Sequence, residues 1–115
     1  MTNIIYKIEN AKIWAKAQAA GIYHGSALDL ADGYIHLSAA EHVRATAHKY
    51  MAGQAGLVLI GVDGNTVGDT LKWEPARDGA LFPHIYGTLP LHAVIDTVPL
   101  PLDENGLHVF GPHIP

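Results

Sequence analysis

The stretch Leu57-Val58-Leu59-Ile60-Gly61-Val62 is a continuous apolar run of strand length near the middle of the chain. A short apolar run bounded by turn signals is typical of a buried central strand. Gly53 and Gly56 precede it, and the turn signal Asp63-Gly64-Asn65 follows it. We therefore expect the rest of the fold to be built around this strand.

The half of the chain before this strand predicts two strands and two helices. Residues 4–8 are rich in β-branched residues and predict a strand. Residues 11–20, mostly alanine with lysine and glutamine, predict a helix that Gly21 ends as a C′ residue. Residues 33–37 predict a strand, and residues 38 to about 51 predict a second helix.

The half after the central strand predicts mainly strands. Residues 70–74 and 92–98 each predict a strand, and residues 107–110 predict a last short one. Residues 75–83, with polar residues and glycine, predict a loop. Strands therefore outnumber helices and gather late, which favours an α+β fold with a mostly antiparallel sheet and two helices in the N-terminal half.

Composition limits the class of protein. The 115 residues suit a single domain, 1–115, and 49% of them are hydrophobic while 16% are charged, which is typical of a globular chain. Cysteine is absent, so disulfides and thiolate metal sites are excluded. The net charge of −4 and scattered basic residues argue against nucleic-acid binding, and no apolar run has the length of a membrane span. We expect a cytoplasmic protein and leave its oligomeric state open.

Two segments with similar chemistry contain the candidate site. One is Ala80-Leu81-Phe82-Pro83-His84-Ile85-Tyr86-Gly87, and the other is Asp32-Gly33-Tyr34-Ile35-His36-Leu37-Ser38. Alternation along the second segment places Tyr34, His36 and Ser38 on one face. We expect one cleft that contains both imidazoles, with His36 and His84 as catalytic candidates.

Each of these residues has a structural alternative. A neutral imidazole at position 36 can orient a ligand hydroxyl or amide, or it can simply bind backbone on a half-buried strand. His84 and Tyr86 share a face if the segment is extended, so Tyr86 can stack on a planar ligand; alternatively, Phe82 and Tyr86 are core residues. Ser38 can bind an anion at the following helix N-terminus, or act only as the first residue of a capping box with Glu41.

Trp73 and Glu74 form the third element of the candidate site. Desolvation by Trp73 would raise the pKa of Glu74 and favour an acid–base role. The alternative is a glutamate paired with Arg77 or Lys72. Arg77 can hold a phosphate or carboxylate through two hydrogen bonds, or it can be a solvated loop charge.

Other chemistries are disfavoured by spacing. His36, His84 and Glu74 are a two-histidine, one-carboxylate set, but no His-x₃-His pair supports a metal site, and we predict none. Ser38 lacks the glycine elbow of a hydrolase nucleophile, and no phosphate-binding glycine loop or dinucleotide fingerprint is present.

The chain resembles a bacterial and plant family, domain of unknown function 952, in several signature blocks. These blocks are segments 32–38, 73–74 and 81–87, the opening Ile5-Tyr6-Lys7-Ile8 and the helix that carries Trp14. The resemblance covers nearly the whole chain. That family is grouped with the ADP-ribosyltransferase-like superfamily, so the resemblance implies a split, mostly antiparallel sheet with an NAD-binding cleft.

By this analogy His36 takes the role of the early-strand histidine, and Tyr86 or Trp73 that of the aromatic that stacks on nicotinamide. The resemblance implies NAD or another nucleotide as ligand and a transferase as the activity. The residues alone leave two alternatives open: a noncatalytic module that binds a small metabolite, and an interaction protein whose aromatic cluster is a dimer face.

Overall fold

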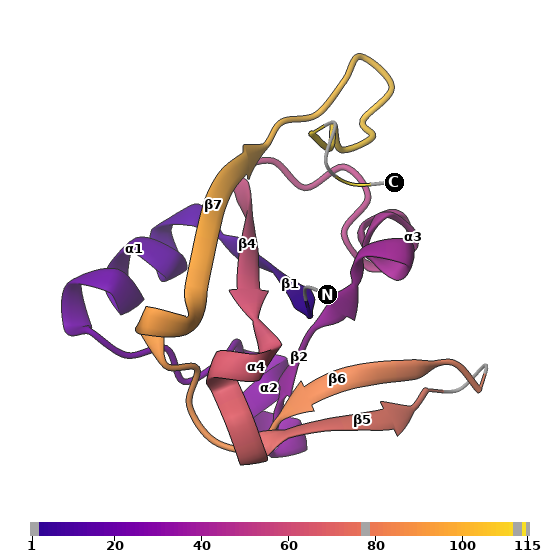
Figure 1. Ribbon diagram of the computed structural model, residues 1–115. Coiled ribbons are helices and arrows are strands. Elements are labelled where there is room, and N and C mark those ends of the chain that lie inside the picture. Colours follow the sequence, from indigo (N-terminus) through magenta and orange to yellow (C-terminus); the bar gives the residue numbers. More distant parts are fainter. Residues whose placement is uncertain (1–2, 77–78, 112–113, 115) are drawn as a thin grey trace.

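Two antiparallel sheets form the framework of the protein (Figure 1). The computed structural model describes residues 3–76, 79–111 and 114. The larger sheet has four strands in the order β3-β1-β4-β7, and the smaller has three in the order β2-β6-β5. The strands are β1 (Ile4–Asn10), β2 (Ile35–His36), β3 (Ser38–Ala39), β4 (Leu57–Asp63), β5 (Leu71–Pro75), β6 (Leu81–Ile85) and β7 (Val94–Leu100).

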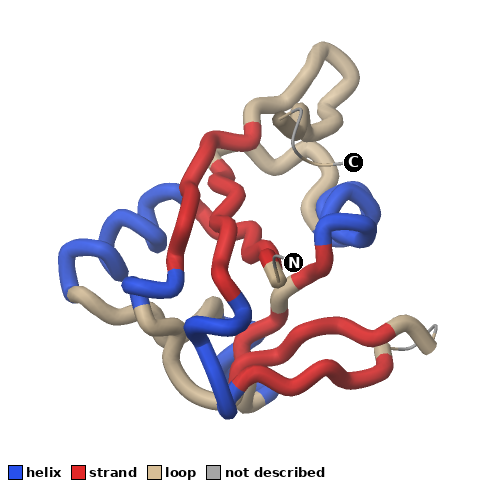
Figure 2. Tube along the Cα trace, in the orientation of Figure 1, coloured by secondary structure: helices blue, strands red, loops and turns tan. Residues whose placement is uncertain are grey.

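Short helices connect these strands, as the tube in Figure 2 shows. The α-helices are α1 (Ala11–Ala20), α2 (Ala27–Asp32), α3 (Ala40–Tyr50) and α4 (Gly64–Val67); the 3₁₀ turns are η1 (Gly68–Thr70) and η2 (Leu91–Ala93). The expected mixture of helices and antiparallel strands is confirmed.

Helix α1 forms where the sequence predicts it, because its end signals are local. The Asn10 side chain accepts hydrogen bonds from the N–H groups of Lys12 and Ile13. Gly21, with φ of 81°, takes the left-handed conformation that ends the helix. These caps set the direction in which the chain leaves β1.

The larger sheet has a hydrophobic cluster on each face. Ile5 and Ile60 pack with Trp14 of α1 on one face. Tyr6 and Leu59 pack with the α3 residues Val43 and Ala47 on the other. Accordingly, α1 and α3 lie on opposite sides of this sheet in Figure 1. Fully burying one such aliphatic side chain stabilises a fold by about 1.5–3 kcal/mol, so β1 and β4 make the stable centre of the molecule.

The prediction for Ser38 is wrong in one respect. Ser38 pairs with Tyr6 of β1 as a strand residue, and its hydroxyl lies 3.1 Å from the hydroxyl of Thr46. The N-cap of α3 is Ala39, which makes no side-chain cap. Because Ser38 is held in β3, its hydroxyl cannot also cap the helix. The capping box that does form lies at Ser26, with Asp29, and opens a helix that the sequence reading missed.

Three other boundaries differ from expectation. The segment expected to be a loop to residue 83 becomes strand β6 from Leu81, since it pairs with both β2 and β5. The turn expected at residues 63–65 continues into the single helical turn α4. The last expected strand, residues 107–110, is reduced to one bridge between Leu102 and His108.

The chain changes sheets at Leu37. This buried residue follows β2 of the smaller sheet and precedes β3 of the larger one, and its N–H donates to the carbonyl of Pro83 at 3.1 Å. His36 and Ser38 therefore belong to different sheets. The expected common face of Tyr34, His36 and Ser38 ends at this crossing.

Candidate functional site

The two histidine segments meet in the smaller sheet. His36 of β2 and His84 of β6 are direct cross-strand partners, and Ile35 pairs with Ile85 beside them. The imidazole centroids lie 5.5 Å apart, with the rings at 70° to each other. Because directly opposed residues of an antiparallel pair point to the same face, both imidazoles lie on one side of this sheet.

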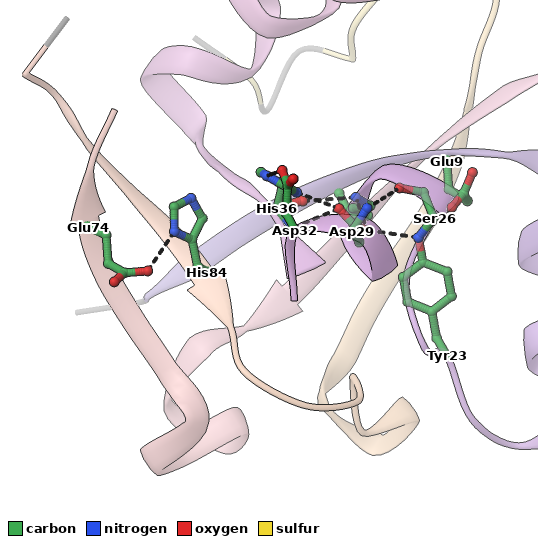
Figure 3. Close-up of polar contacts among 9 residues, drawn as sticks. Glu9, Tyr23, Ser26, Asp29, Asp32, His36, Glu74 and His84 are labelled. Atoms are coloured by element: carbon green, nitrogen blue, oxygen red, sulfur yellow. Dashed lines mark hydrogen bonds and ion pairs between the residues drawn. The ribbon is translucent and has the colours of Figure 1, made fainter. Parts of the chain in front are cut away.

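His36 is held from its buried side by Asp29 of α2. Its Nδ1 atom lies 2.6 Å from Oδ1 of Asp29, and its backbone N–H donates to the same oxygen at 3.1 Å. The Asp29 side chain is 1% exposed, whereas that of His36 is 32% exposed. One edge of the imidazole is thus anchored in the protein while another part of the ring reaches solvent (Figure 3).

Asp29 is itself held by a buried lysine. Lys7 Nζ of β1 donates to Oδ2 of Asp29 at 2.7 Å and to the carbonyl of His36 at 3.0 Å. The N–H of Ser26 donates to the same carboxylate at 2.9 Å. Burial acts to raise the pKa of Asp29, but the Lys7 ammonium and the hydrogen bonds from Lys7, Ser26 and His36 outweigh it and hold the pKa below its ordinary value. Asp29 is therefore a carboxylate at neutral pH.

A second carboxylate meets His36 on the outer side. Nε2 of His36 lies 3.0 Å from Oδ2 of Asp32, the last residue of α2. A carboxylate only accepts hydrogen bonds, so both contacts can be hydrogen bonds at once only when both ring nitrogens carry a proton. Both ring nitrogens of His36 thus face a carboxylate oxygen, one buried and one exposed.

His84 has a different environment. Its Nδ1 atom lies 2.8 Å from Oε1 of Glu74, and the hydroxyl of Tyr86 donates to that same oxygen at 2.7 Å. Within the described residues, Nε2 of His84 has no hydrogen-bond partner. When Nδ1–H of His84 donates a hydrogen bond to Glu74, the neutral imidazole presents an unshared electron pair at Nε2.

The expected rise in the pKa of Glu74 is wrong. The hydrogen bond from Tyr86, then the one from His84, lower the pKa of Glu74, and desolvation opposes them only in part. Trp73 does not desolvate Glu74 from the same side, because successive strand residues point to opposite faces. In turn, the hydrogen bond to Glu74 raises the pKa of Tyr86 to about 12.

Tyr34 lies at the centre of the aromatic groups. Its ring centroid is 4.2 Å from that of His84, 4.7 Å from that of His36 and 5.2 Å from that of Tyr86. The three interplanar angles lie between 35° and 44°. We call Tyr34, His36, His84, Tyr86 and Glu74 the histidine-pair site; all five come from the sequence expectation.

The other expected site residues lie apart from this group or next to it. Phe82 pairs with Glu74 across β5 and β6, and its ring stacks on that of His42 at 5.0 Å. Trp73, 41% exposed, pairs with Pro83 on the opposite face of the hairpin. Ser38 is buried in the larger sheet. Arg77 lies outside the described residues.

Sequence reasoning missed Lys7, Asp29 and Asp32. Ser26 and Asp29 match the spacing of a capping box, a signal that could have placed α2 and its acidic residue. Asp32 stands four residues before His36 in the sequence. Lys7 gave no local signal, since it lies on a β-branched strand and reaches the site only through the tertiary fold.

A second buried carboxylate, Glu9, lies near this network. The Tyr23 hydroxyl donates to Glu9, and both residues are buried (Figure 3). Burial, followed by the hydrogen bond to Glu9, raises the pKa of Tyr23. Tyr23 also packs edge-on against Trp14, so this pair belongs to the core.

The described pockets lie away from the histidine-pair site. One lies on the larger sheet and is lined by β1, β4 and β7, and a second, of about 150 Å³, lies between α3 and the chain near Phe110. Among the described residues, no group of three His, Asp or Glu side chains is arranged to hold a metal ion. No helix in the described part of the chain combines the length and apolar character needed to cross a membrane.

Comparison with known proteins agrees with the resemblance drawn from the sequence blocks. The model of a protein family described as "Protein of unknown function (DUF952)" matches residues 8–97, so the chain belongs to this family. Among curated proteins, no match was found.

Solved structures of one bacterial protein share the fold. The crystal structure of protein CC0527 from Caulobacter crescentus is 46% identical, with a TM-score of 0.92 over 97% of this chain and 98% of that one. Its solution NMR structure is 47% identical, with a TM-score of 0.85 over 96% and 95% of the two chains. The architecture of the present chain is therefore also that of a determined structure.

Proposed function

We propose that this protein is an enzyme that binds a small molecule on the histidine-pair site and uses His36 and His84 as a general acid–base pair. The observation that supports this most is that the two imidazoles, paired across two strands, have opposite hydrogen-bonding roles. His36 faces carboxylates through both nitrogens and offers N–H groups, whereas His84 donates to Glu74 and keeps Nε2 as an acceptor. Proton donor and proton acceptor lie at one place, which acid–base catalysis needs.

In this proposal Glu74 orients His84 and is not itself the base. Two donors already bind its Oε1 atom and lower its pKa, so the carboxylate is a weak proton acceptor at neutral pH. The same contact selects the tautomer of His84 whose Nε2 accepts a proton. His84 then takes a proton from a bound ligand, and Nε2–H of His36 supplies one to the group that develops negative charge.

The ligand that we propose is NAD or another nucleotide, and the reaction is a group transfer. A planar base can lie against the rings of Tyr34 and Tyr86, which are partly exposed beside the two imidazoles. Two adjacent antiparallel sheets are consistent with the split sheet of the ADP-ribosyltransferase-like grouping. That grouping is an analogy of fold, so the assignment of the ligand depends on a binding experiment.

Calorimetric titration with NAD, ADP-ribose and AMP tests the ligand, and product analysis after incubation with NAD tests turnover. We expect saturable binding of at least one nucleotide. Removing one member of a general acid–base pair lowers a rate by about 10²–10⁴-fold, so His84→Gln and His36→Gln should each lose turnover by that factor.

The matched control is His92→Gln, which changes an exposed histidine in η2 and should leave binding and turnover unchanged. Binding without turnover would contradict the enzyme and favour a noncatalytic module. No response to any nucleotide would overturn the proposed ligand. A dimer that Tyr86→Ala dissociates would instead favour an interaction surface.

A further inference from the structure

The carboxylate of Asp32 lies where a ligand of His36 would bind. Oδ2 of Asp32 is 3.0 Å from Nε2 of His36, and this is the only hydrogen bond or ion pair of the Asp32 side chain with the described residues. The Asp32 side chain is 41% exposed and ends a short helix, so rotation about its own bonds can remove it from the imidazole. Figure 3 shows the two side chains adjacent at the end of α2.

The opposite edge of the imidazole cannot move in the same way. Nδ1 and the backbone N–H of His36 both bind Asp29, which is buried and paired with Lys7. Gly25 packs so closely on Asp29 that a Cβ added there would come within 2.7 Å of the Asp29 Cβ. If Asp32 leaves, His36 therefore stays in place with its Nε2 atom unpaired.

The charges beside Nε2 of His36 change when Asp32 leaves. Lys7 compensates the charge of Asp29, so displacement of Asp32 leaves Nε2 of His36 without its outer partner and removes one negative charge beside it. His84 of the middle strand β6 pairs with His36 of β2 and with Lys72 of β5. All three side chains therefore point to the same face of the sheet. Lys72 is exposed and makes no ion pair with another described residue, while Glu74 remains bound to His84.

We propose that Asp32 occupies, in the free protein, the subsite for an oxyanion of the ligand at Nε2 of His36. The ligand group is a phosphate or a carboxylate, since either one reproduces the hydrogen bond and the charge that Asp32 supplies. The subsite deepens the proposed function and rests on it, because it states which part of a ligand His36 receives.

The experiment follows the imidazole ¹⁵N and ¹H signals of His36 by NMR while inorganic phosphate or acetate is added. The variants are the wild type, Asp32→Ala, and Asp69→Ala, which removes an exposed carboxylate of η1 as a charge-matched control. We expect phosphate or acetate to shift the His36 signals saturably. Without the competing carboxylate, Asp32→Ala should bind on the order of tenfold more tightly, while Asp69→Ala should match the wild type.

A double variant, Asp32→Ala with His36→Gln, should lose the binding, as followed through the backbone amide of Gly33. Equal affinity in the wild type and Asp32→Ala would overturn the proposal, as would weaker binding in Asp32→Ala, because Asp32 would then be a ligand contact itself. A stronger response to phosphate than to acetate assigns the subsite to phosphorylated ligands, and the reverse order assigns it to carboxylates.

Failure of this proposal can be told from failure of the proposed function. If NAD shifts the His84 signals but neither anion shifts those of His36, the oxyanion subsite is wrong and the proposed nucleotide ligand stands. If the anions bind at His36 but no nucleotide shifts His84, the subsite stands and the nucleotide ligand is wrong.

Discussion

His36 and His84 face each other across β2 and β6, and each places its Nδ1 atom against a carboxylate oxygen. The two carboxylates differ in origin and burial. Asp29 comes from a helix and is buried, whereas Glu74 comes from the neighbouring strand β5 and is partly exposed. The histidine-pair site therefore has one edge anchored in the core and one edge on a surface hairpin, and substitutions on the two edges should have different effects.

Asp29→Asn should destabilise the protein by about 3–5 kcal/mol, because it leaves the buried Lys7 ammonium without its counter-ion. Urea denaturation at pH 7 measures this change. Asp32→Asn is the control: its carboxylate is exposed, so the cost should stay below about 1 kcal/mol. Equal costs for the two variants would show that Asp29 does not hold the site.

Acid should weaken the fold through Asp29. Its pKa is lower in the folded chain than the ordinary value of about 3.9, so the folded state binds fewer protons than the unfolded state around that pH. The stabilisation is complete above the unfolded pKa and is lost as the pH falls through the folded pKa. Unfolding free energies measured from pH 7 downward should decline below about pH 4.

The same series in Asp29→Asn isolates this contribution. The decline should be shallower in the variant, because the asparagine does not titrate. If the wild type and the variant lose stability in parallel between pH 5 and pH 2, other carboxylates cause the acid sensitivity.

Glu74→Gln should return the pKa of Tyr86 from about 12 toward its ordinary value near 10, because the hydrogen bond to the glutamate carboxylate is the largest cause of the rise, and the glutamate charge adds to it alongside burial. The ultraviolet absorbance of tyrosinate, titrated against pH, measures the change. The signal is assigned to Tyr86 by repeating both titrations in a Tyr86→Phe background, where the difference should vanish. A tyrosine titration that Glu74→Gln leaves unchanged would show that the Glu74 carboxylate does not raise the pKa of Tyr86.

Gly25→Ala should cost more stability than Gly21→Ala. Both glycines have positive φ, 106° and 81°, so alanine is strained at either position by about 1–2 kcal/mol. A Cβ at Gly21 would have nothing within 4 Å, whereas one at Gly25 would press on Asp29. Thermal or urea unfolding of the two variants compares them, and equal losses would mean that Asp29 can shift without cost.

Local signals explain which parts of the fold the sequence predicts. Helix α1 was placed correctly because Asn10 and Gly21 cap it with neighbouring groups. Strand β6 was not predicted, because residues 75–83, with polar residues, glycine and Pro83, suggest a loop. In the structure, the carbonyl of Pro83 accepts the N–H of Leu37, and the partner of Pro83 across the sheet is Trp73. Tertiary pairing thus overrides the local preference there.

The same distinction applies to the histidine-pair site. The similar chemistry of the two segments around His36 and His84 led to the prediction that the imidazoles meet, and the two residues are cross-strand partners. The buried support was not predictable, since Lys7 lies 22 residues from Asp29 and an isolated lysine on a strand is ordinarily solvent-exposed. The lowered pKa of Glu74 was missed because it depends on which face of β5 each side chain takes.

The hydrogen bond from Lys7 to the carbonyl of His36 joins β1, an inner strand of the larger sheet, to the backbone of the smaller sheet. Loosening of the large sheet by heat or denaturant must therefore release the imidazole at the same moment. The NMR signals of His36 can accordingly report on global unfolding, because its side chain reaches the surface while Asp29 and Lys7, which hold it, are buried.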